Sequence, residues 1–495
     1  MVQCALFTHI GGEKMYDITI IGAGVSGSSL AYELSKYDVS VCVLEAENDV
    51  AVKTTKANSA ILHAGYDPLP GSLNAKLNVE GSVLAKEICS KLDVPRNQIG
   101  SLVVAFSEED LEMVQTLYER GVKNKVPDIQ ILTKEETLAK EPNLNPDIYG
   151  ALYAPSAAVV NPWEYTIAMA EVAIQNGVTF SFNQKVKDIQ KAGDHFEIKT
   201  DNETIESKYI INAAGVNAGE IHELVSEPTF KTIPCRGEYY LLDLEETDTV
   251  KHIVFQCPTK VGKGILVAPT THGNIIVGPN AENIPDDWVN TGKDVANTAT
   301  GLKGVAEGAK KSVPTINLAN SIRNFSGVRA NTDREDFIIE QVIPQFYDVA
   351  GIKSPGLTAA PANSLYLIEL MKQDGLVLSK KNDYVDERKR IHFNQASIEE
   401  KQQLISENPD YGRIICRCEN ITEADIRESL HQTLPAKSVE GVKRRTIAGM
   451  GRCQGGFCGP RVVEIIADEL NISPLEVDLD RWNSHILVSQ SKEVL

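Results

Sequence analysis

Four cysteines near the C-terminus have the residue type and the clustering that metal binding requires. Cys416 and Cys418 form a C-x-C pair, and Cys453 and Cys458 form a C-x4-C pair. Four thiolates can bind either zinc or an iron–sulfur cluster. Structural zinc prefers C-x2-C knuckles, and neither pair has that spacing, so the pattern favours an iron–sulfur cluster over zinc.

The residues around the second cysteine pair support this interpretation. The stretch "AGMGRCQGGFCGPR" (448–461) is rich in glycine, which leaves backbone N–H groups free to hydrogen-bond cluster sulfides. Thr422 with Asp425 predicts a helix start after the first pair, and Pro460 suits the first turn of a closing helix. Five nearby cations are expected to offset the negative charge of a cluster: Lys443, Arg444, Arg445, Arg452 and Arg461.

A second pattern with chemical meaning lies near the N-terminus. Gly22, Gly24 and Gly27 form a G-x-G-x-x-G turn between an apolar strand and a helix. Such glycines allow a tight turn and close approach of the backbone to a pyrophosphate, which the helix N-terminus attracts. Glu45, at the end of the next strand, is placed to bind ribose hydroxyls. The unit predicts dinucleotide binding and does not by itself separate FAD from NAD.

The segments that must position these residues are spread along the chain. After Glu45 the sequence continues into a small, polar stretch, where an NAD enzyme would continue into another plain βαβ unit. Strand patterns return at 209–215 and again just before a Gly/Pro turn (351–356) that precedes a helix. Pieces of one nucleotide-binding domain are therefore separated by two inserts, 91–150 and 226–326, which carry alternating strand patterns.

Length, composition and charge restrict the class of protein. A chain of 495 residues is expected to form two or three domains. Its net charge of −19 argues against nucleic-acid binding and still permits an anionic substrate in a local cationic pocket. The sequence has no long apolar run that predicts a membrane span. The first fourteen residues lack the features of a signal peptide and are expected to precede the fold, and the scattered remaining cysteines indicate a reducing, cytoplasmic setting.

Several motifs together resemble a known superfamily. The glycine fingerprint is followed, in this order, by "NSAILHAG", "CRGEYY", "GKGILVAPTTHGNIIVGP", "FSGVRANTDREDFII" and "GIKSPGLTAAPA". They resemble the FAD-dependent D-amino-acid-oxidase superfamily, most closely its type II glycerol-3-phosphate oxidases and dehydrogenases, with L-2-hydroxyglutarate oxidases as cousins. The stretch 413–470 resembles the [2Fe–2S] domain of the bacterioferritin-associated ferredoxin type. The resemblances imply FAD and a [2Fe–2S] cluster as cofactors.

The same resemblances predict the fold class, α/β (α+β). They imply a Rossmann-like FAD-binding domain of the D-amino-acid-oxidase/glutathione-reductase type, an antiparallel β-sheet substrate domain and a small helical [2Fe–2S] domain. The expected boundaries are 16–90, 151–225 and 327–379 for the FAD-binding domain, 91–150 and 226–326 for the substrate (cap) domain, 380–410 for a linker, 411–475 for the [2Fe–2S] domain and 476–495 for a C-terminal tail.

The resemblance also implies roles for individual residues. His63 matches the proposed catalytic base, and Lys263, Arg329 and Ser354 are expected to bind substrate. Arg323, Lys353 and His272 are lesser candidates for the same pocket. The expected cofactor-binding residues are Gly22, Gly24, Gly27, Glu45, Thr55, Asn58, Ser59, Val186, Gly215, Gly356, Leu357 and Thr358. The expected metal ligands are Cys416, Cys418, Cys453 and Cys458.

These expectations define one predicted function and its alternatives. The resemblance implies an FAD-dependent dehydrogenase of sn-glycerol 3-phosphate that passes electrons through a [2Fe–2S] cluster to an acceptor protein or companion subunits, through which it could associate peripherally with a membrane. One alternative is a dehydrogenase of an L-2-hydroxy acid or an amino acid, in which Arg329 would bind a carboxylate. Another is an electron-transfer subunit of a larger complex, whose flavin has no substrate of its own.

Overall fold

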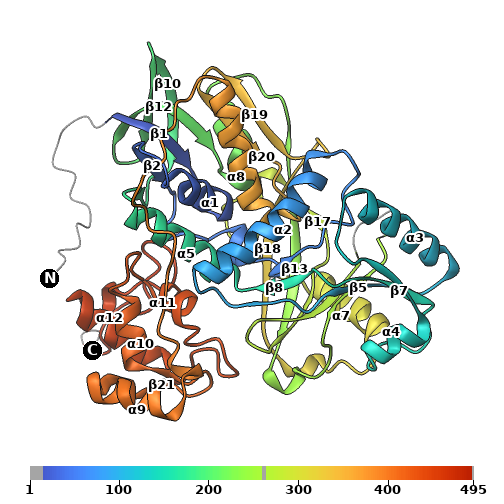
Figure 1. Cartoon of the computed structure of the whole chain (residues 1–495). Coiled ribbons are helices and arrows are strands. Elements are labelled where there is room, and N and C mark those ends of the chain that lie inside the picture. The colour runs from blue at the N-terminus through green and yellow to red at the C-terminus, as the bar shows by residue number, and fades with distance from the viewer. Residues whose placement is uncertain (1–14, 259–263, 493–495) are drawn as a thin grey trace.

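A computed structural model describes residues 15–258 and 264–492. The expected N-terminal extension (1–14) and the expected substrate-binding residue Lys263 lie outside the described residues. Figure 1 shows three regions: a sheet with helices packed on it, a second sheet with its own helices, and a small helical region coloured orange and red.

The first sheet has a parallel centre. Its five parallel strands are, in order, β20 (Phe346–Ala350), β12 (Thr204–Asn212), β1 (Met15–Ile21), β2 (Val41–Leu44) and β9 (Thr179–Ser181). Antiparallel strands extend it: β10 (Val186–Ala192), β11 (His195–Thr200) and β19 (Ile338–Ile343). Ile18 pairs with Val41 on one side and Tyr209 on the other. Ile18 and Ile20 are fully buried, as expected for strands covered on both faces.

Helices from distant parts of the chain pack beside this sheet. They are α1 (Val25–Leu34), α2 (Leu73–Lys91), α5 (Pro162–Gln175) and α8 (Gly356–Gln373). Helix α1 packs against α5 and α8, and α2 packs against α8 (Figure 1). A Cβ atom on Gly81 of α2 would lie 2.3 Å from the carbonyl oxygen of Thr358, so glycine allows α2 and α8 to pack closely.

The second sheet is formed by the two inserts together. Its strands are β5 (Ser101–Ala105), β6 (Gln130–Thr133), β7 (Gly150–Ala154), β13 (Thr232–Leu242), β14 (Ile253–Gln256), β15 (Leu266–Pro269), β16 (Ile275–Gly278), β17 (Glu282–Asn283) and β18 (Ser321–Thr332). Its helices are α3 (Glu108–Lys123), α4 (Lys134–Lys140) and α7 (Ala299–Ser312). The sheet is mostly antiparallel, as predicted, but β5 and β14 pair in parallel where the two inserts meet. A short sheet of β3 (Ile61–Leu62), β8 (Ala158–Val160) and β4 (Arg96–Asn97) joins the inserts to the first region.

The C-terminal region is small and mainly helical. It contains α9 (Ile398–Glu407), β21 (Ile414–Cys416), β22 (Ile421–Thr422), α10 (Glu423–Ser429), α11 (Val439–Thr446) and α12 (Gly459–Leu470). The Thr422 hydroxyl accepts a hydrogen bond from the Asp425 N–H, and the Asp425 carboxylate accepts one from the Thr422 N–H. The predicted helix start is therefore confirmed as a capping box, and Pro460 lies in the first turn of α12.

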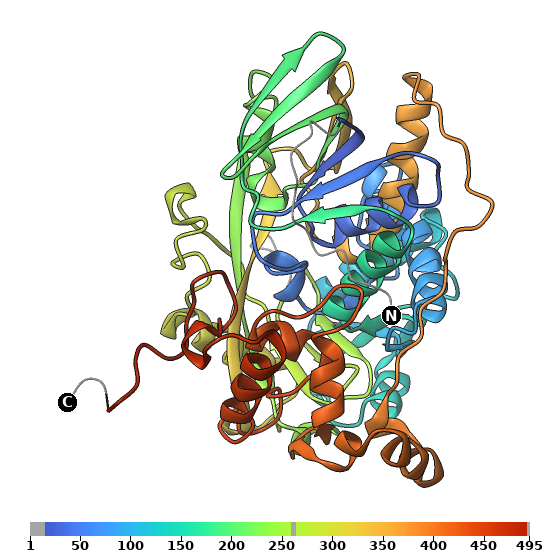
Figure 2. The same cartoon turned by 90° about the vertical axis from the view of Figure 1, so that its left-hand side faces the viewer.

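The elements cross some of the predicted segment limits. The boundaries at 150 and 326 fall inside β7 and β18, which remain in the second sheet to Ala154 and Thr332. In the expected linker, the buried side chain of Arg388 forms an ion pair of 2.6 Å with Glu171 on α5, so this segment is anchored along the first region (Figure 2). Across the described residues, no helix combines the length and the apolar character that crossing a membrane requires.

Candidate functional site

A large pocket with a volume of about 1010 Å³ is lined by residues from both sheets. That volume is at the upper end of the range for small-molecule sites. Thirteen predicted site residues line it: Gly22, Gly24, Glu45, Thr55, Asn58, Ser59, His63, Val186, Gly215, Arg329, Ser354, Gly356 and Leu357. The fold therefore brings together residues from seven separate stretches of the sequence.

The glycine turn at the start of α1 forms one wall of this pocket. Gly22 has a φ of +103°, and a Cβ atom there would lie 2.6 Å from the Ala213 carbonyl oxygen. A Cβ atom on Gly27 would lie 1.9 Å from the Gly22 carbonyl oxygen, so Gly27 permits the tight turn without itself lining the pocket. The N-cap residue of α1, Gly24, has no side chain to cap the helix, and the first turn holds no acidic residue. This helix N-terminus therefore fits a pyrophosphate group.

Glu45 connects the glycine turn to the loop that follows β2. Its Oε2 accepts a hydrogen bond of 2.7 Å from the Ala23 N–H, and its Oε1 accepts one of 2.9 Å from the Glu47 N–H. Burial raises the pKa of the Glu45 carboxyl above its usual value. Each carboxylate oxygen can accept a further hydrogen bond, so the position fits a ribose hydroxyl.

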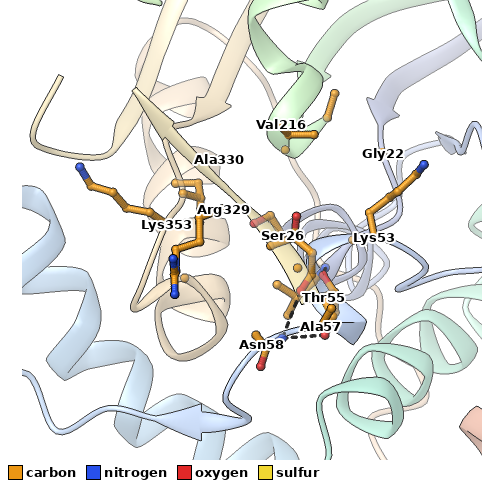
Figure 3. Close-up of a pocket in the computed structure, with 18 of the residues that line it drawn as sticks. Gly22, Ser26, Lys53, Thr55, Ala57, Asn58, Val216, Arg329, Ala330 and Lys353 are labelled. Atoms are coloured by element: carbon orange, nitrogen blue, oxygen red, sulfur yellow. Dashed lines mark hydrogen bonds between the residues drawn. The ribbon is translucent and has the colours of Figure 1, made fainter. Parts of the chain in front are cut away.

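Thr55 and Asn58 shape the same pocket wall through hydrogen bonds to the backbone. The Thr55 hydroxyl accepts a bond of 3.0 Å from the Val25 N–H at the start of α1. The Asn58 amide donates a bond of 2.7 Å to the Thr55 carbonyl and accepts one from the Ala60 N–H. Figure 3 shows Thr55 and Asn58 close to Ser26. Thr55 thus fixes the loop against the helix start that would face the pyrophosphate, and Asn58 holds the shape of the loop itself.

His63 follows β3 and is held by residues from two other elements. Its N–H donates a bond of 2.8 Å to the Thr358 hydroxyl, and its Nε2 lies 3.2 Å from the Ser354 hydroxyl. Its ring stacks on Phe255 of β14 with the ring centroids 5.8 Å apart. Thr358 is fully buried and does not line the pocket, so it supports the His63 backbone. The imidazole nitrogen can accept or donate a proton inside the pocket.

The N-terminus of α8 faces the pocket beside His63. Ser354, Gly356 and Leu357 line the cavity at the start of this 18-residue helix. No described side chain caps its first turn, and the Gly356 and Thr358 N–H groups donate to the carbonyl oxygens of Lys353 and Pro355, so this helix start presents the positive end of its dipole to a ligand. This end of the pocket favours an electron-rich or anionic ring.

Arg329 supplies positive charge at this end of the pocket. It lies on β18 opposite Cys235 of β13, and its guanidinium donates to the Asn280 carbonyl oxygen at 3.3 Å and to the Cys235 sulfur at 3.5 Å. A Cβ atom on Gly237 would lie 2.7 Å from the guanidinium, so glycine leaves room for it. Figure 3 shows Arg329 and Lys353 together on one side of the view and Lys53 on the other. The guanidinium has further donors with which to bind an anion.

Two of the lesser candidates lie elsewhere. Arg323 lies outside the described pocket lining, and its guanidinium is 4.0 Å from Glu440 of the C-terminal region. His272 is also outside that lining, with Nε2 3.2 Å from the Asn161 amide nitrogen, and burial lowers its pKa. Lys353, the third lesser candidate, does line the pocket.

Residues that sequence reasoning missed also line the pocket. Tyr239 and Phe255 form an aromatic wall from the second sheet, with Tyr239 stacked on Phe325 at a centroid distance of 4.7 Å. Side chains alternate between the two faces of β13, which places Cys235 and Tyr239 on the same face. This alternation in the sequence is the signal from which part of the wall could have been predicted. Arg481 and Trp482, from the expected C-terminal tail, line the pocket too, and no sequence motif marks them.

The four predicted cysteine ligands meet as two pairs. Cys416 and Cys458 are buried and hydrogen-bonded to each other, and this hydrogen bond lowers the pKa of the Cys416 thiol below its usual value. The sulfurs of Cys418 and Cys453 lie 3.9 Å apart nearer the surface. No group of three or more described His, Cys, Asp or Glu side chains is arranged to hold a single metal ion. Two pairs fit a [2Fe–2S] cluster, in which each iron takes two protein ligands.

The predicted role of the nearby cations needs correction, because carboxylates engage them. Arg444 and Arg445 are buried against Asp49, each with a nitrogen 2.8 Å from a carboxylate oxygen. Arg452 pairs with Glu245 at 3.0 Å. Lys443 pairs with Glu440, and Arg461 pairs with Glu423 and Glu464. These charges attach the C-terminal region to the rest of the chain and stabilise its helices.

Two family models match this chain. The FAD dependent oxidoreductase model matches residues 17–370, and the BFD-like [2Fe-2S] binding domain model matches residues 414–468. The chain therefore belongs to the FAD dependent oxidoreductase family and carries a BFD-like [2Fe-2S] binding domain. The predicted fold class and both predicted cofactors, FAD and a [2Fe–2S] cluster, are confirmed.

Individual relatives extend this likeness. The chain is 47% identical to a glycerol 3-phosphate dehydrogenase of Caloramator mitchellensis, over 97% of this chain and 99% of the relative. It is 36% identical to a glycerol 3-phosphate oxidase of Mycoplasma genitalium, over 74% of this chain and 96% of the relative. Its structure is similar to that of the dithionite-reduced L-alpha-glycerophosphate oxidase of Mycoplasma pneumoniae with FAD bound. That comparison has a TM-score of 0.71 and 32% identity, and it covers 76% of this chain and 99% of the oxidase.

Proposed function

We propose that this FAD-dependent oxidoreductase oxidises sn-glycerol 3-phosphate to dihydroxyacetone phosphate and passes the electrons through its [2Fe–2S] cluster to a protein acceptor. The observation that carries the proposal is the convergence of a histidine and an arginine, His63 and Arg329, on the pocket that the FAD fingerprint also lines. The glycerol 3-phosphate dehydrogenase relative, which matches nearly the full length including the cysteine region, supports the substrate.

Arg329 and Lys353 would hold the phosphate group. Two cations at one end of the pocket suit a phosphate dianion better than a single carboxylate, which one guanidinium satisfies. Lys263, outside the described residues, is proposed as a further cation at this end. The aromatic wall of Tyr239 and Phe255 excludes water and so strengthens these interactions.

His63 would remove the proton from the C2 hydroxyl. Its Nε2 lies in the pocket, and its main chain and its ring are held by Thr358 and Phe255. Ser354 lies within hydrogen-bond distance of the same nitrogen and would orient it or bind the substrate hydroxyl. When bound, FAD supplies the hydride acceptor and the [2Fe–2S] cluster a one-electron carrier. The N-terminus of α8 would stabilise negative charge beside His63.

The surface near Cys418 and Cys453 would be the electron exit. These two sulfurs are the more exposed pair of ligands, and the nearby Phe457 side chain is 85% exposed. An exposed aromatic side chain beside a redox centre is a suitable contact for an electron acceptor protein or a companion subunit. Cys416 and Cys458, which are buried, would form the inner half of the site.

An anaerobic assay with a dye acceptor tests the proposal. Glycerol 3-phosphate is expected to reduce the purified protein with turnover, while L-2-hydroxyglutarate and an N-methyl amino acid give none. Spectra recorded during the same titration should show the flavin and cluster absorbances bleaching together. Turnover of a hydroxy acid or an amino acid without turnover of glycerol 3-phosphate would contradict the proposed substrate. Absence of flavin reduction by any of the three would instead favour a pure electron-transfer subunit.

A further inference from the structure

The end of the chain returns to the FAD pocket. Arg481 and Trp482 follow the last helix of the [2Fe–2S] region, yet they line the same cavity as Gly22 and Glu45 near the other end of the sequence. The indole of Trp482 is 67% exposed, so it lies on the wall of the cavity and is not buried in protein. An exposed tryptophan on a pocket wall offers a large apolar face to a ligand.

Hydrogen bonds and ion pairs fix this part of the tail on the loop that follows β2. The Asn48 amide donates a bond of 2.7 Å to the Asp480 carbonyl oxygen. The Asp480 carboxylate forms ion pairs with Lys56 at 2.6 Å and with Arg444 at 2.8 Å. Although burial opposes ionisation, these two cations hold the pKa of Asp480 at about 2. The tail is therefore held in place directly before Arg481.

The contacts of Arg481 show which end of the pocket the tail covers. Its Nε lies 3.7 Å from the Glu47 carboxylate, and the Glu47 N–H donates to Glu45, the residue placed for a ribose hydroxyl. The Asn183 N–H donates to the Glu47 carbonyl oxygen, so the stretch leading to Val186 meets the same loop. His63 and Arg329, the residues proposed to act on the substrate, mark the end of the pocket where the reaction would occur. The tail therefore lies at the other end, beside the residues placed to bind the adenosine of FAD.

We propose that Trp482 and Arg481 cover the adenosine half of the bound FAD, with the indole packed against the adenine and the guanidinium near the pyrophosphate. An aromatic side chain can stack on any base because every base presents a π-face. A cation near a pyrophosphate offsets its charge. The proposal rests on FAD as the cofactor and is independent of the substrate. It makes the C-terminal tail part of the FAD site and couples retention of the flavin to docking of the [2Fe–2S] region.

Titration of the flavin-free, full-length protein with FAD, ADP and FMN tests the proposal. ADP carries the adenosine and the diphosphate without the flavin, and FMN carries the flavin and one phosphate without the adenosine. Trp482→Ala is expected to raise the Kd for FAD and for ADP about tenfold, the loss expected for one stacked base, and to leave the Kd for FMN within about twofold. Trp482→Phe, which keeps an aromatic face, should retain most of the affinity. Arg481→Gln should weaken ADP binding and reduce its dependence on salt.

Val488→Ala is the matched control, because Val488 belongs to the same tail, is 95% exposed and lies outside the described pocket lining. It should change none of the three constants. Cluster absorbance and circular dichroism report whether each variant is folded. Unchanged ADP and FAD affinities in Trp482→Ala, or an equal loss for ADP and FMN, would overturn the proposal. An unchanged salt dependence in Arg481→Gln would overturn the part assigned to Arg481.

Discussion

The hydroxyl of Ser354 lies 3.2 Å from Nε2 of His63, although the two residues are 291 positions apart in the sequence. The contact joins the loop after β3 to the start of α8, and both residues line the pocket. It places a titratable nitrogen beside a hydroxyl and an uncapped helix N-terminus. A base at this position has its orientation set before substrate arrives, which is the arrangement that proton abstraction requires.

Replacing His63 is expected to separate chemistry from cofactor binding. His63→Asn removes the ring nitrogen, so reduction of the flavin by glycerol 3-phosphate should slow about 10²- to 10⁴-fold. The content of FAD should remain that of the parent protein, since His63 contacts Thr358 through its main-chain N–H, which asparagine keeps. Anaerobic stopped-flow absorbance measures the rate. Ser354→Ala should slow the same step less, and an unaltered rate in His63→Asn would contradict the role of base.

Replacing Arg329 is expected to weaken binding of the anionic substrate. Arg329→Gln removes charge-assisted hydrogen bonds worth about 1.5–3 kcal/mol, which corresponds to a KM about 10- to 100-fold higher. Lys353→Gln should raise KM as well, because a phosphate dianion engages both cations. Steady-state kinetics with a dye acceptor measure both effects.

Arg323→Gln is the control for the arginine substitution. Arg323 lies on β18 as Arg329 does, but it faces Glu440 and lies outside the described pocket lining. The KM of Arg323→Gln should stay within about twofold of the parent value, because Arg323 lies outside the described pocket lining and its ion pair, at 4.0 Å, is long and partly exposed. Equal effects of the two substitutions would show that the loss comes from disturbance of β18, and would contradict substrate binding by Arg329.

The sequence predicted the parts of this molecule whose chemistry is local. The glycine turn, Glu45 and the four cysteines carry their signal within short stretches, because a tight turn and a pair of ligands depend on neighbouring residues. The expected place of Arg329 in the pocket was predicted from the motif "FSGVRANTDREDFII". Its neighbours Cys235 and Asn280 could not be predicted, because strand pairing and side-chain packing across the sheet bring them together.

The attachment of the C-terminal region shows the limit of sequence reasoning more sharply. Asp49 is one of several acidic residues after β2, and Arg445 is one of several cations near the cysteines. Nothing in the two local sequences indicates that they form a buried, doubly hydrogen-bonded pair across 396 positions. The interpretation of Arg444 and Arg445 as neutralising the cluster therefore assigned their charge to the wrong partner. Long-range ion pairs depend on how domains dock, which the sequence pattern does not encode.

Removing the Asp49 carboxylate is expected to loosen the C-terminal region. Asp49→Asn leaves the guanidinium group of Arg445 buried without its ion partner, while Arg444 keeps its ion pair with Asp480, at a cost of about 3–5 kcal/mol. The melting temperature by circular dichroism should fall at pH 7. Asp188→Asn is the control, because Asp188 pairs with Lys199 on the surface and its loss should leave the melting temperature close to that of the parent protein. Equal melting temperatures of Asp49→Asn and the parent protein would contradict a stabilising role.

The same pair predicts how stability depends on pH. Burial opposes ionisation of Asp49, but Arg445 and Arg444 outweigh it and hold the pKa of its carboxyl well below the usual 3.8. A lowered native-state pKa gives stability that is complete above the unfolded pKa and is lost as the pH falls toward the native value. The difference in melting temperature between the parent and Asp49→Asn should therefore be full at pH 6 and shrink below about pH 4. A difference that stays constant between pH 6 and pH 3 would contradict this linkage.

Replacing a cysteine of the exposed pair is expected to remove the cluster and spare the flavin. Cys418→Ser should abolish the electron paramagnetic resonance signal of the reduced [2Fe–2S] cluster and lower the iron content, because a ligand that pairs with Cys453 is lost. Glycerol 3-phosphate should still reduce the flavin, but electron transfer to a protein acceptor should stop. Cys89→Ser is the control, since Cys89 is a buried thiol of the first region. The iron content of this variant is expected to equal that of the parent protein. Full iron content in Cys418→Ser would exclude Cys418 as a ligand, and electron transfer to the protein acceptor at the parent rate without the cluster would show that electrons leave directly from the flavin.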